Sequence, residues 1–236
     1  MTSLIDQFER LLTQLAANPR IELLEEEFSY EPTPATRLAR SAAFQLQEDG
    51  FTIPEAGWEL FFSMYGEGMD IAWISHPDPS HPALADPLVG SLNMVTIGTS
   101  IDNRKYRLQM DVPEPGAEHA SYFDNSGHQD TVLPTMLLYD RAQRQYLGLY
   151  AFLRPELVKL DLDLAEYAAA ALAWHGAYGW QLLYCDLEEF EGLPLYLRRE
   201  VYRLKEALPR LFPEADWSII ATKKSYFDTQ QQDEAV

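Results

Sequence analysis

Helical spacing of apolar residues marks both ends of the chain. A first helix is predicted over residues 3–17, with its apolar stripe at Leu4, Phe8, Leu11, Leu12 and Leu15. Asn18-Pro19 ends it. A C-terminal helix is predicted over residues 194–211, with its stripe at Leu197, Val201, Leu204 and Leu208. The tail, residues 228–236, has nothing to bury and is predicted to be flexible.

Strand-like patterns fill the middle of the chain. "MDIAWI", "GSLNMVTIG" and "KYRLQMDV" each read as a strand, and "MLLYD" and "YLGLYAF" flank "RAQRQ" as an antiparallel hairpin. Helical patterns return at Asp163 and Glu166, whose spacing is that of a capping box before "YAAAALAWHG". "WQLLYC" fits either state. Two more helices are predicted earlier, over residues 35–48 and from Pro54 to Tyr65.

Gly66 and Gly68 raise the question of a phosphate-binding loop. Such loops follow a strand and open a helix, so that free N–H groups point at the anion. Here an aromatic helix runs into the glycines and a strand leaves them, so the pattern predicts a corner between helix and strand. The order of helices, antiparallel strands and helices predicts one α+β domain over residues 1–236. Its central, mostly antiparallel sheet is flanked by the N- and C-terminal helices.

The segment "IPEAGWELFFSMYGEGMDIAWI" followed by "VGSLNMVTI" resembles the core of the SMI1/KNR4 family, or SUKH superfamily. Members share a proline-opened helix, an aromatic pair, an Asn-Gly-type turn, a Trp-containing strand and a glycine-led strand. The similar region covers residues 35–190, and Tyr65-Gly66-Glu67-Gly68 departs from the usual turn. The resemblance implies a small α+β binding domain with no shared catalytic residues. Many bacterial members resemble immunity proteins, and the fungal namesake is a regulatory scaffold of cell-wall synthesis.

Composition narrows the class of protein. The 236 residues are 47% hydrophobic and 23% charged, which is typical of a soluble globular domain. The single cysteine, Cys185, excludes an internal disulfide and a CxxC pair, and it is expected to be a small buried residue. No apolar run is long enough to span a membrane, and charged residues interrupt the N-terminal apolar stretch. A cytoplasmic location is therefore expected.

Charge is the strongest global signal. Lys and Arg total 18 against 37 Asp and Glu, a net charge of −19. Phosphate contacts need cations, so nucleic acid and anionic membranes are disfavoured as partners, whereas a basic protein is favoured. Solubility alone would also account for this acidity.

Two acidic clusters are candidate partner-binding sites. One comprises Glu25, Glu26 and Glu27, beside Glu22. The other comprises Asp186, Glu188, Glu189 and Glu191 around Phe190, which is predicted to be an exposed anchor within a charged rim. The alternative for each cluster is a solvated acidic loop.

Two polar segments could carry chemistry. His76, Asp78 and His81 lie on one proline-rich loop and could offer metal ligands. His119, Asp124, His128 and Asp130 surround an Asn-Ser-Gly turn. The first segment is expected to be an ordinary loop and the second an ordinary turn, so no metal, cofactor or catalytic residue is predicted. Trp58, Trp73, Trp174 and Trp180 are expected in the core.

Three functions remain open. The first is a non-enzymatic bacterial immunity protein that binds a basic toxin, such as a nuclease. The second is a cytoplasmic regulatory scaffold of the SMI1/KNR4 type. The third is a metal-dependent hydrolase using one of the two histidine-bearing segments.

Overall fold

The computed structural model describes residues 4–30, 64–94, 120–124, 127–128, 131–140, 145–153 and 156–230. The helix predicted over residues 35–48, residues 54–63 of the helix predicted after it, and the strand "KYRLQMDV" lie outside the described residues. So does Trp58.

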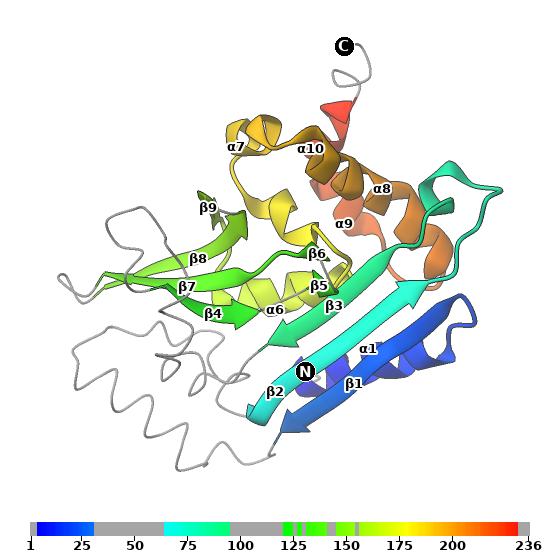
Figure 1. The fold of residues 1–236 in the computed structure, drawn as a ribbon, viewed down its shortest axis with the longest axis horizontal. Helices are drawn as coiled ribbons and strands as arrows, with labels where there is room; N and C mark the ends of the chain where they lie inside the picture. The colour runs from blue at the N-terminus through cyan, green and yellow to red at the C-terminus, as the bar shows by residue number, and fades with distance from the viewer. Residues whose placement is uncertain are drawn as a thin grey trace.

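An antiparallel sheet of seven strands forms the centre of the fold, in the order β1-β2-β3-β4-β7-β8-β9 (Figure 1). The strands are β1 (Ile21–Tyr30), β2 (Met64–Ser75), β3 (Val89–Met94), β4 (Ala120–Asp124), β7 (Thr135–Asp140), β8 (Gln145–Leu153) and β9 (Glu156–Leu160). β5 (Gly127–His128) and β6 (Thr131–Val132) form a separate pair. The predicted hairpin is confirmed, because β7 pairs with β8.

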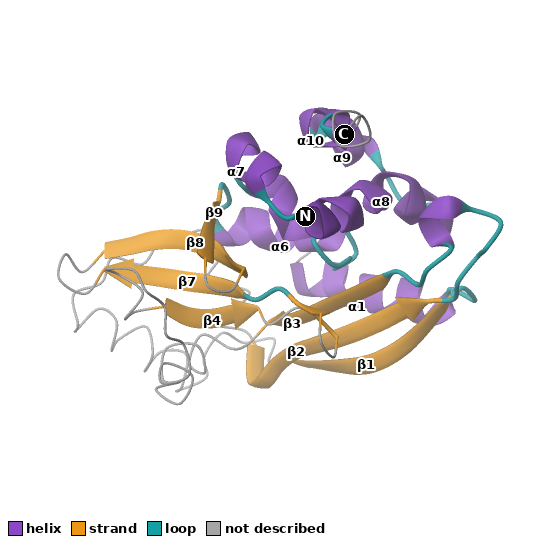
Figure 2. Cartoon of the chain, turned by 45° about the horizontal axis from the view of Figure 1, so that its top comes forward, coloured by secondary structure: helices purple, strands orange, loops and turns teal. Residues whose placement is uncertain are grey.

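Helices cover one face of this sheet, here called the inner face (Figure 2). They are α1 (Leu4–Ala17), α6 (Leu164–Ala173), α7 (Leu187–Gly192), α8 (Leu195–Leu211), α9 (Ser218–Thr222) and α10 (Lys224–Asp228). Short 3₁₀ helices span Pro82–Leu84 and Trp180–Tyr184, and the second of these gives the state of "WQLLYC". The α+β class and its antiparallel sheet are confirmed.

The N-terminal helix is confirmed, and the segment after it is a strand. Phe8, Leu11 and Leu15 of α1 are buried in the main core, as their spacing predicts. The acidic stretch that follows is β1, which pairs antiparallel with β2 from Ile21 to Tyr30. The cluster is therefore part of a strand and not of the loop given as its alternative, although its glutamates are exposed to solvent. Consecutive glutamates show none of the apolar–polar alternation that marks a strand in the sequence. The segment is a strand because pairing with β2 supplies its backbone hydrogen bonds.

The predicted corner at Gly66 and Gly68 is also wrong. Met64 already lies in β2, opposite Tyr30 of β1, so both glycines are inside the strand. The two glycines, a residue type that often ends helices, predicted a helix end here. Pairing with β1 instead extends strand β2 past both of them. The pairing is irregular between Phe28 and Tyr30, in a region where glycine tolerates a bulge.

Trp73 is the largest side chain that β2 sends into the core. It is buried, as are Met69 and Ile71 on the same inner face, which confirms the predicted alternation. Its indole N–H donates to the carbonyl oxygen of His175, at 2.9 Å. Gly90 lies opposite Trp73 on β3, and a Cβ there would be 2.1 Å from Cε2 of the indole. The glycine that leads β3 is therefore required by the tryptophan.

A left-handed turn follows α6 and attaches it to β3. The capping box of Asp163 and Glu166 is confirmed at the start of this helix. At its end, His175 (φ 54°) and Gly176 (φ 65°) reverse the chain. The carbonyl of Gly176 accepts the N–H of Ser91 at 2.8 Å, so the turn is hydrogen-bonded to the sheet.

The C-terminal helix is confirmed as α8, with Leu197, Val201, Leu204 and Leu208 buried. The prediction of a flexible tail is wrong for residues 228–230. Asp228 ends α10, and Thr229 is buried with its hydroxyl 2.8 Å from the hydroxyl of Tyr202. A hydroxyl pair thus holds the chain against α8 beyond Phe227, the last buried apolar residue of the described chain. Residues 231–236 lie outside the described residues.

Gly90→Ala is expected to lower the free energy of unfolding by about 3 kcal/mol, because the new methyl group overlaps the Trp73 indole. Urea denaturation measures the change. Gly192→Ala is the matched control, since no heavy atom lies within 4 Å of its added Cβ, and it is expected to stay within about 0.5 kcal/mol of the native protein. Equal stability of the two variants would contradict the packing described here.

Candidate functional site

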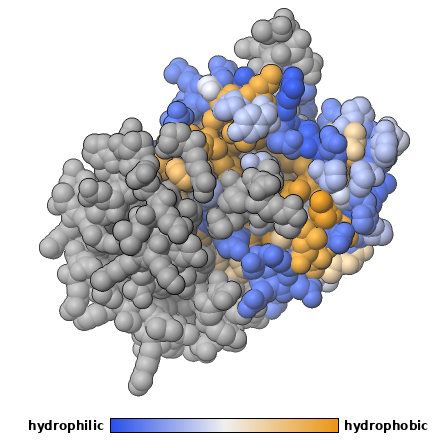
Figure 3. Space-filling model, viewed as in Figure 1, coloured by the Kyte–Doolittle hydropathy of each residue, from blue (hydrophilic) through white to orange (hydrophobic). Residues whose placement is uncertain are grey.

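The candidate site is the carboxylate cluster of strands β1 and β2, here called the acidic edge: Glu25, Glu26, Glu27 and Asp70. The three glutamates are exposed on β1. Register places Glu27 directly opposite Asp70 and Glu25 opposite Ala72, so Glu25, Glu27 and Asp70 share the outer face of the sheet. In Figure 3, hydrophilic residues gather at the lower middle of the described surface, where β1 and β2 lie in Figure 1.

Asp70 is the electrostatic centre of this edge. Its pKa is raised to about 6, mainly by partial burial and next by a hydrogen bond with Glu25. The charges of Glu25 and Glu27 act in the same direction, while a hydrogen bond with Asn93 opposes them. Its Oδ1 atom is buried without a hydrogen-bond partner among the described residues. The fold therefore places negatively charged carboxylates close to one another, and a cationic group nearby would stabilise them.

Sequence reasoning missed Asp70. The residue lies on the polar side of the alternation in "MDIAWI", which gave a weak signal of an outer-face position. Its glutamate neighbours are far away in sequence, and only the register between β1 and β2 brings them together.

The second acidic cluster has a different arrangement. Phe190 is fully buried and packs edge-on against Tyr202 and Tyr226, at ring-centroid distances of 6.1 and 5.1 Å. The predicted exposed anchor is therefore wrong, because this aromatic side chain fastens α7 to α8 and α10. Asp186 caps α7 by accepting the N–H of Glu188 at 2.8 Å.

Glu188, Glu189 and Glu191 remain exposed on α7. Figures 1 and 2 both show α7 well apart from β1. The two predicted acidic clusters consequently do not form one surface, and folding brings a further carboxylate, Asp70, to the β1 cluster.

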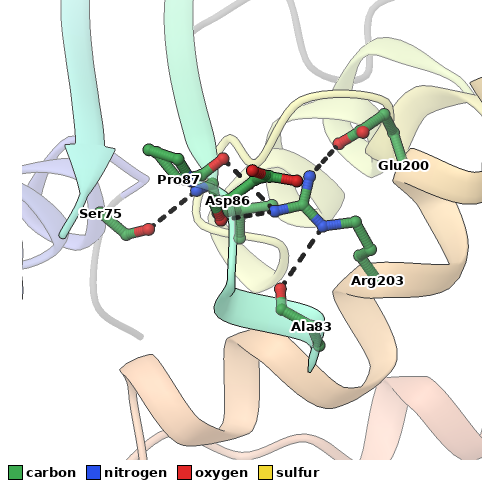
Figure 4. A network of polar contacts seen from close by, with 7 residues as sticks. Ser75, Ala83, Asp86, Pro87, Glu200 and Arg203 are labelled. Carbon is green, nitrogen blue, oxygen red and sulfur yellow. Dashed lines mark hydrogen bonds and ion pairs between the residues drawn. The ribbon is translucent and has the colours of Figure 1, made fainter. Parts of the chain in front are cut away.

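The proline-rich loop between β2 and β3 is held from α8 by Arg203 (Figure 4). The guanidinium donates to the carbonyl oxygens of Ala83, Asp86 and Pro87, at 3.4, 2.8 and 3.3 Å. It also donates to the Glu200 carboxylate at 2.7 Å. Figure 4 further shows Ser75 at the base of the loop, whose Oγ accepts the N–H of Leu88 at 2.8 Å. Arg203 thus supplies hydrogen-bond donors to several backbone carbonyl oxygens of one loop.

The histidines of this loop do not converge. The Asp78 carboxylate accepts the hydroxyl and the N–H of Ser80, and these bonds hold its pKa below its usual value. His81 lies 3.9 Å from Glu206, and His76 is exposed. Among the described residues, no group of three or more His, Cys, Asp or Glu side chains could hold a metal ion.

Asp124 belongs to a buried hydrogen-bond network. Its two carboxylate oxygens accept the N–H of Asn93 at 3.0 Å and the hydroxyl of Tyr167 at 2.7 Å. The Tyr167 hydroxyl is also 2.9 Å from Oγ1 of Thr135. Burial and the nearby Asp124 charge raise the pKa of Tyr167 well above its ordinary value, so the phenol stays protonated and keeps donating. This network joins β3, β4, β7 and α6 in the core.

Among the candidate residues of the second histidine-bearing segment, the structure describes the side chain of Asp124 alone. His119 and Asp130 lie outside the described residues, and His128 is placed only as part of strand β5. Asp124 therefore has a structural role in the described part of the chain, where it accepts the hydroxyl of Tyr167.

Several expectations for the core are confirmed. Trp73, Trp174 and Trp180 are buried. Cys185 is buried too, and burial raises the pKa of its thiol to about 12. Within the described residues, none of the helices combines the length and the apolar character needed to cross a bilayer.

No protein-family model, curated protein or solved structure matches this chain. The resemblance to the SMI1/KNR4 family therefore remains a prediction from the sequence.

The Asp70 carboxyl is expected to titrate near pH 6 when followed by carbon NMR. Glu25→Gln should move this midpoint down toward 3.8, because it removes a hydrogen bond and a charge that favour the protonated acid. Because the folded-state pKa is raised from 3.8 to about 6, Asp70 opposes folding increasingly as pH rises between these two values, and the effect is complete above 6. Asp70→Asn should therefore gain stability at pH 7.5 and almost none at pH 4. Glu188→Gln on α7 is the control, and a midpoint equally shifted by it would refute this account.

Tyr167→Phe is expected to lower the free energy of unfolding by about 2 kcal/mol, because the buried Asp124 carboxylate loses this hydroxyl donor. Thermal and urea unfolding measure it. Tyr196→Phe removes a hydroxyl from a side chain that is 69% exposed and should change stability by less than about 0.5 kcal/mol. A Tyr167→Phe protein as stable as the control would show that the network contributes nothing.

Proposed function

We propose that this protein is a non-enzymatic binding protein that holds a basic protein partner against its acidic edge. The observation that carries the proposal is the gathering of Glu25, Glu27 and Asp70 on one face of adjacent strands, with the pKa of Asp70 raised to about 6. Such a cluster opposes folding at neutral pH, and a partner's Lys or Arg side chains would relieve the repulsion.

The charge of the whole chain supports the same proposal. At −19, the surface attracts a basic protein from a distance and accelerates its encounter, more strongly at low ionic strength. The acidic edge lies on regular strands rather than on a loop, so its carboxylates are presented in a fixed arrangement. Rigid presentation limits the entropy lost when a partner is bound.

The biological role we propose is that of a bacterial immunity protein, acting in the cytoplasm on a basic toxin such as a nuclease. Its support is the sequence resemblance to the SMI1/KNR4 family together with the acidic edge. Strands β2 and β3, which carry Trp73 and Gly90 of the resembling segment, also position Asp70. Binding would occlude the toxin's active site or its substrate channel. A regulatory scaffold would use the same surface for a cellular partner.

The proposal is tested by co-expressing the protein with the toxin domain encoded beside its gene. The native protein should restore growth and bind the purified toxin rapidly. The triple variant E25Q/E26Q/E27Q should reduce the association rate constant by about tenfold at low salt, because it removes three steering charges. The matched control E188Q/E189Q/E191Q removes three charges from α7 and should bind like the native protein.

Different outcomes point to different functions. Equal loss in the two triple variants would mean that net charge acts without a defined site, against the proposal. Protection by the native protein with no physical binding would also overturn it. Binding of a chromosomally encoded cellular protein, sensitive to the β1 variant alone, would favour the scaffold.

A further inference from the structure

Strand β1 ends the seven-stranded sheet. Its partner is β2, and no other described strand pairs with its opposite edge (Figure 1). Alternate residues of such an edge strand direct their backbone N–H and C=O groups away from the sheet. These N–H and C=O groups can hydrogen-bond to a further strand, which is one of the recurrent ways in which proteins capture extended segments.

The middle of β1 has the regular geometry that strand addition needs. The pairing of β1 with β2 is irregular between Leu23 and Glu25 and again between Phe28 and Tyr30. Between these points, residues 25–28 pair without a shift against residues 69–72. This regular stretch coincides with the acidic edge, so backbone groups and carboxylates are offered together.

The charge pattern selects the partner. Consecutive strand residues point to opposite faces, so Glu25 and Glu27 lie on the outer face and Glu26 on the inner side. A neighbouring strand places its side chains directly opposite. Three consecutive Lys or Arg residues would therefore each meet a glutamate, whereas a second copy of this acidic strand would be repelled.

We propose that β1 receives an extended segment with three consecutive basic residues, which adds to residues 25–28 as a further strand of the sheet. The inference rests on the proposed function and names how the basic partner is held. Charged residues can also guard an edge strand against aggregation. Guarding would be served by the exposed glutamates alone, yet Asp70 on the interior strand β2 adds another carboxylate to their outer face.

The test uses the full chain and the synthetic peptide Thr-Val-Lys-Arg-Lys-Val-Thr, with a fluorescent label for anisotropy measurements. A second peptide of the same sequence carries N-methyl groups on its three central amides, which keeps the charges and removes the backbone donors. The methylated peptide should bind at least about tenfold more weakly, because backbone hydrogen bonds to β1 are lost. Hydrogen exchange should show slowed amides in residues 25–28 with the unmethylated peptide only.

The outcomes separate the two proposals. Equal binding of both peptides, weakened by E25Q/E26Q/E27Q and not by E188Q/E189Q/E191Q, would overturn strand addition and leave the acidic contact of the proposed function standing. Failure of the unmethylated peptide to bind would overturn strand addition as well, while the toxin experiment tests the function separately. Binding that neither triple variant weakens would count against both.

Discussion

The hydrogen bond from the Trp73 indole to the carbonyl of His175 is the constraint on which the fold depends most. Burying an indole N–H without an acceptor costs free energy, and this carbonyl supplies the acceptor where the two layers meet. The carbonyl faces the sheet because His175 and Gly176 take left-handed conformations after α6. Gly90 in turn leaves room for the indole on β3. Sheet and helices are thereby fixed in one relative position.

This junction determines where the acidic edge lies. With Trp73 held on the inner face, alternation places Asp70 on the outer face of the same strand. β1 then adds outside β2, and its register brings Glu27 opposite Asp70. Arg203, which belongs to α8, holds the loop that follows the C-terminal end of β2. The carboxylates are thus presented by strands that are fastened along their length, which suits a preformed binding surface.

Local signals, including the hairpin of β7 and β8, were readable from the sequence, and pairing between distant segments was not. The leucine stripe of α8 and the capping box of Asp163 depend on residues within one or two turns of each other, so spacing revealed them. β1 contains a run of glutamates and shows no alternation, and it is a strand because β2 lies beside it. Phe190 looked exposed among carboxylates, but Tyr202 and Tyr226 reach it from distant segments. Asp70 was missed for the same reason.

The two acidic clusters differ in whether the fold itself accounts for them. On α7, Asp186 caps the helix, and Glu188 and Glu189 lie in its first turn, where the helix dipole favours negative charge. Those carboxylates have a local stabilising role. On the sheet, burial first and then Glu25 and Glu27 raise the pKa of Asp70, so that its charge opposes folding at neutral pH. A cluster that the fold would be more stable without requires another explanation, and contact with a cationic partner supplies one.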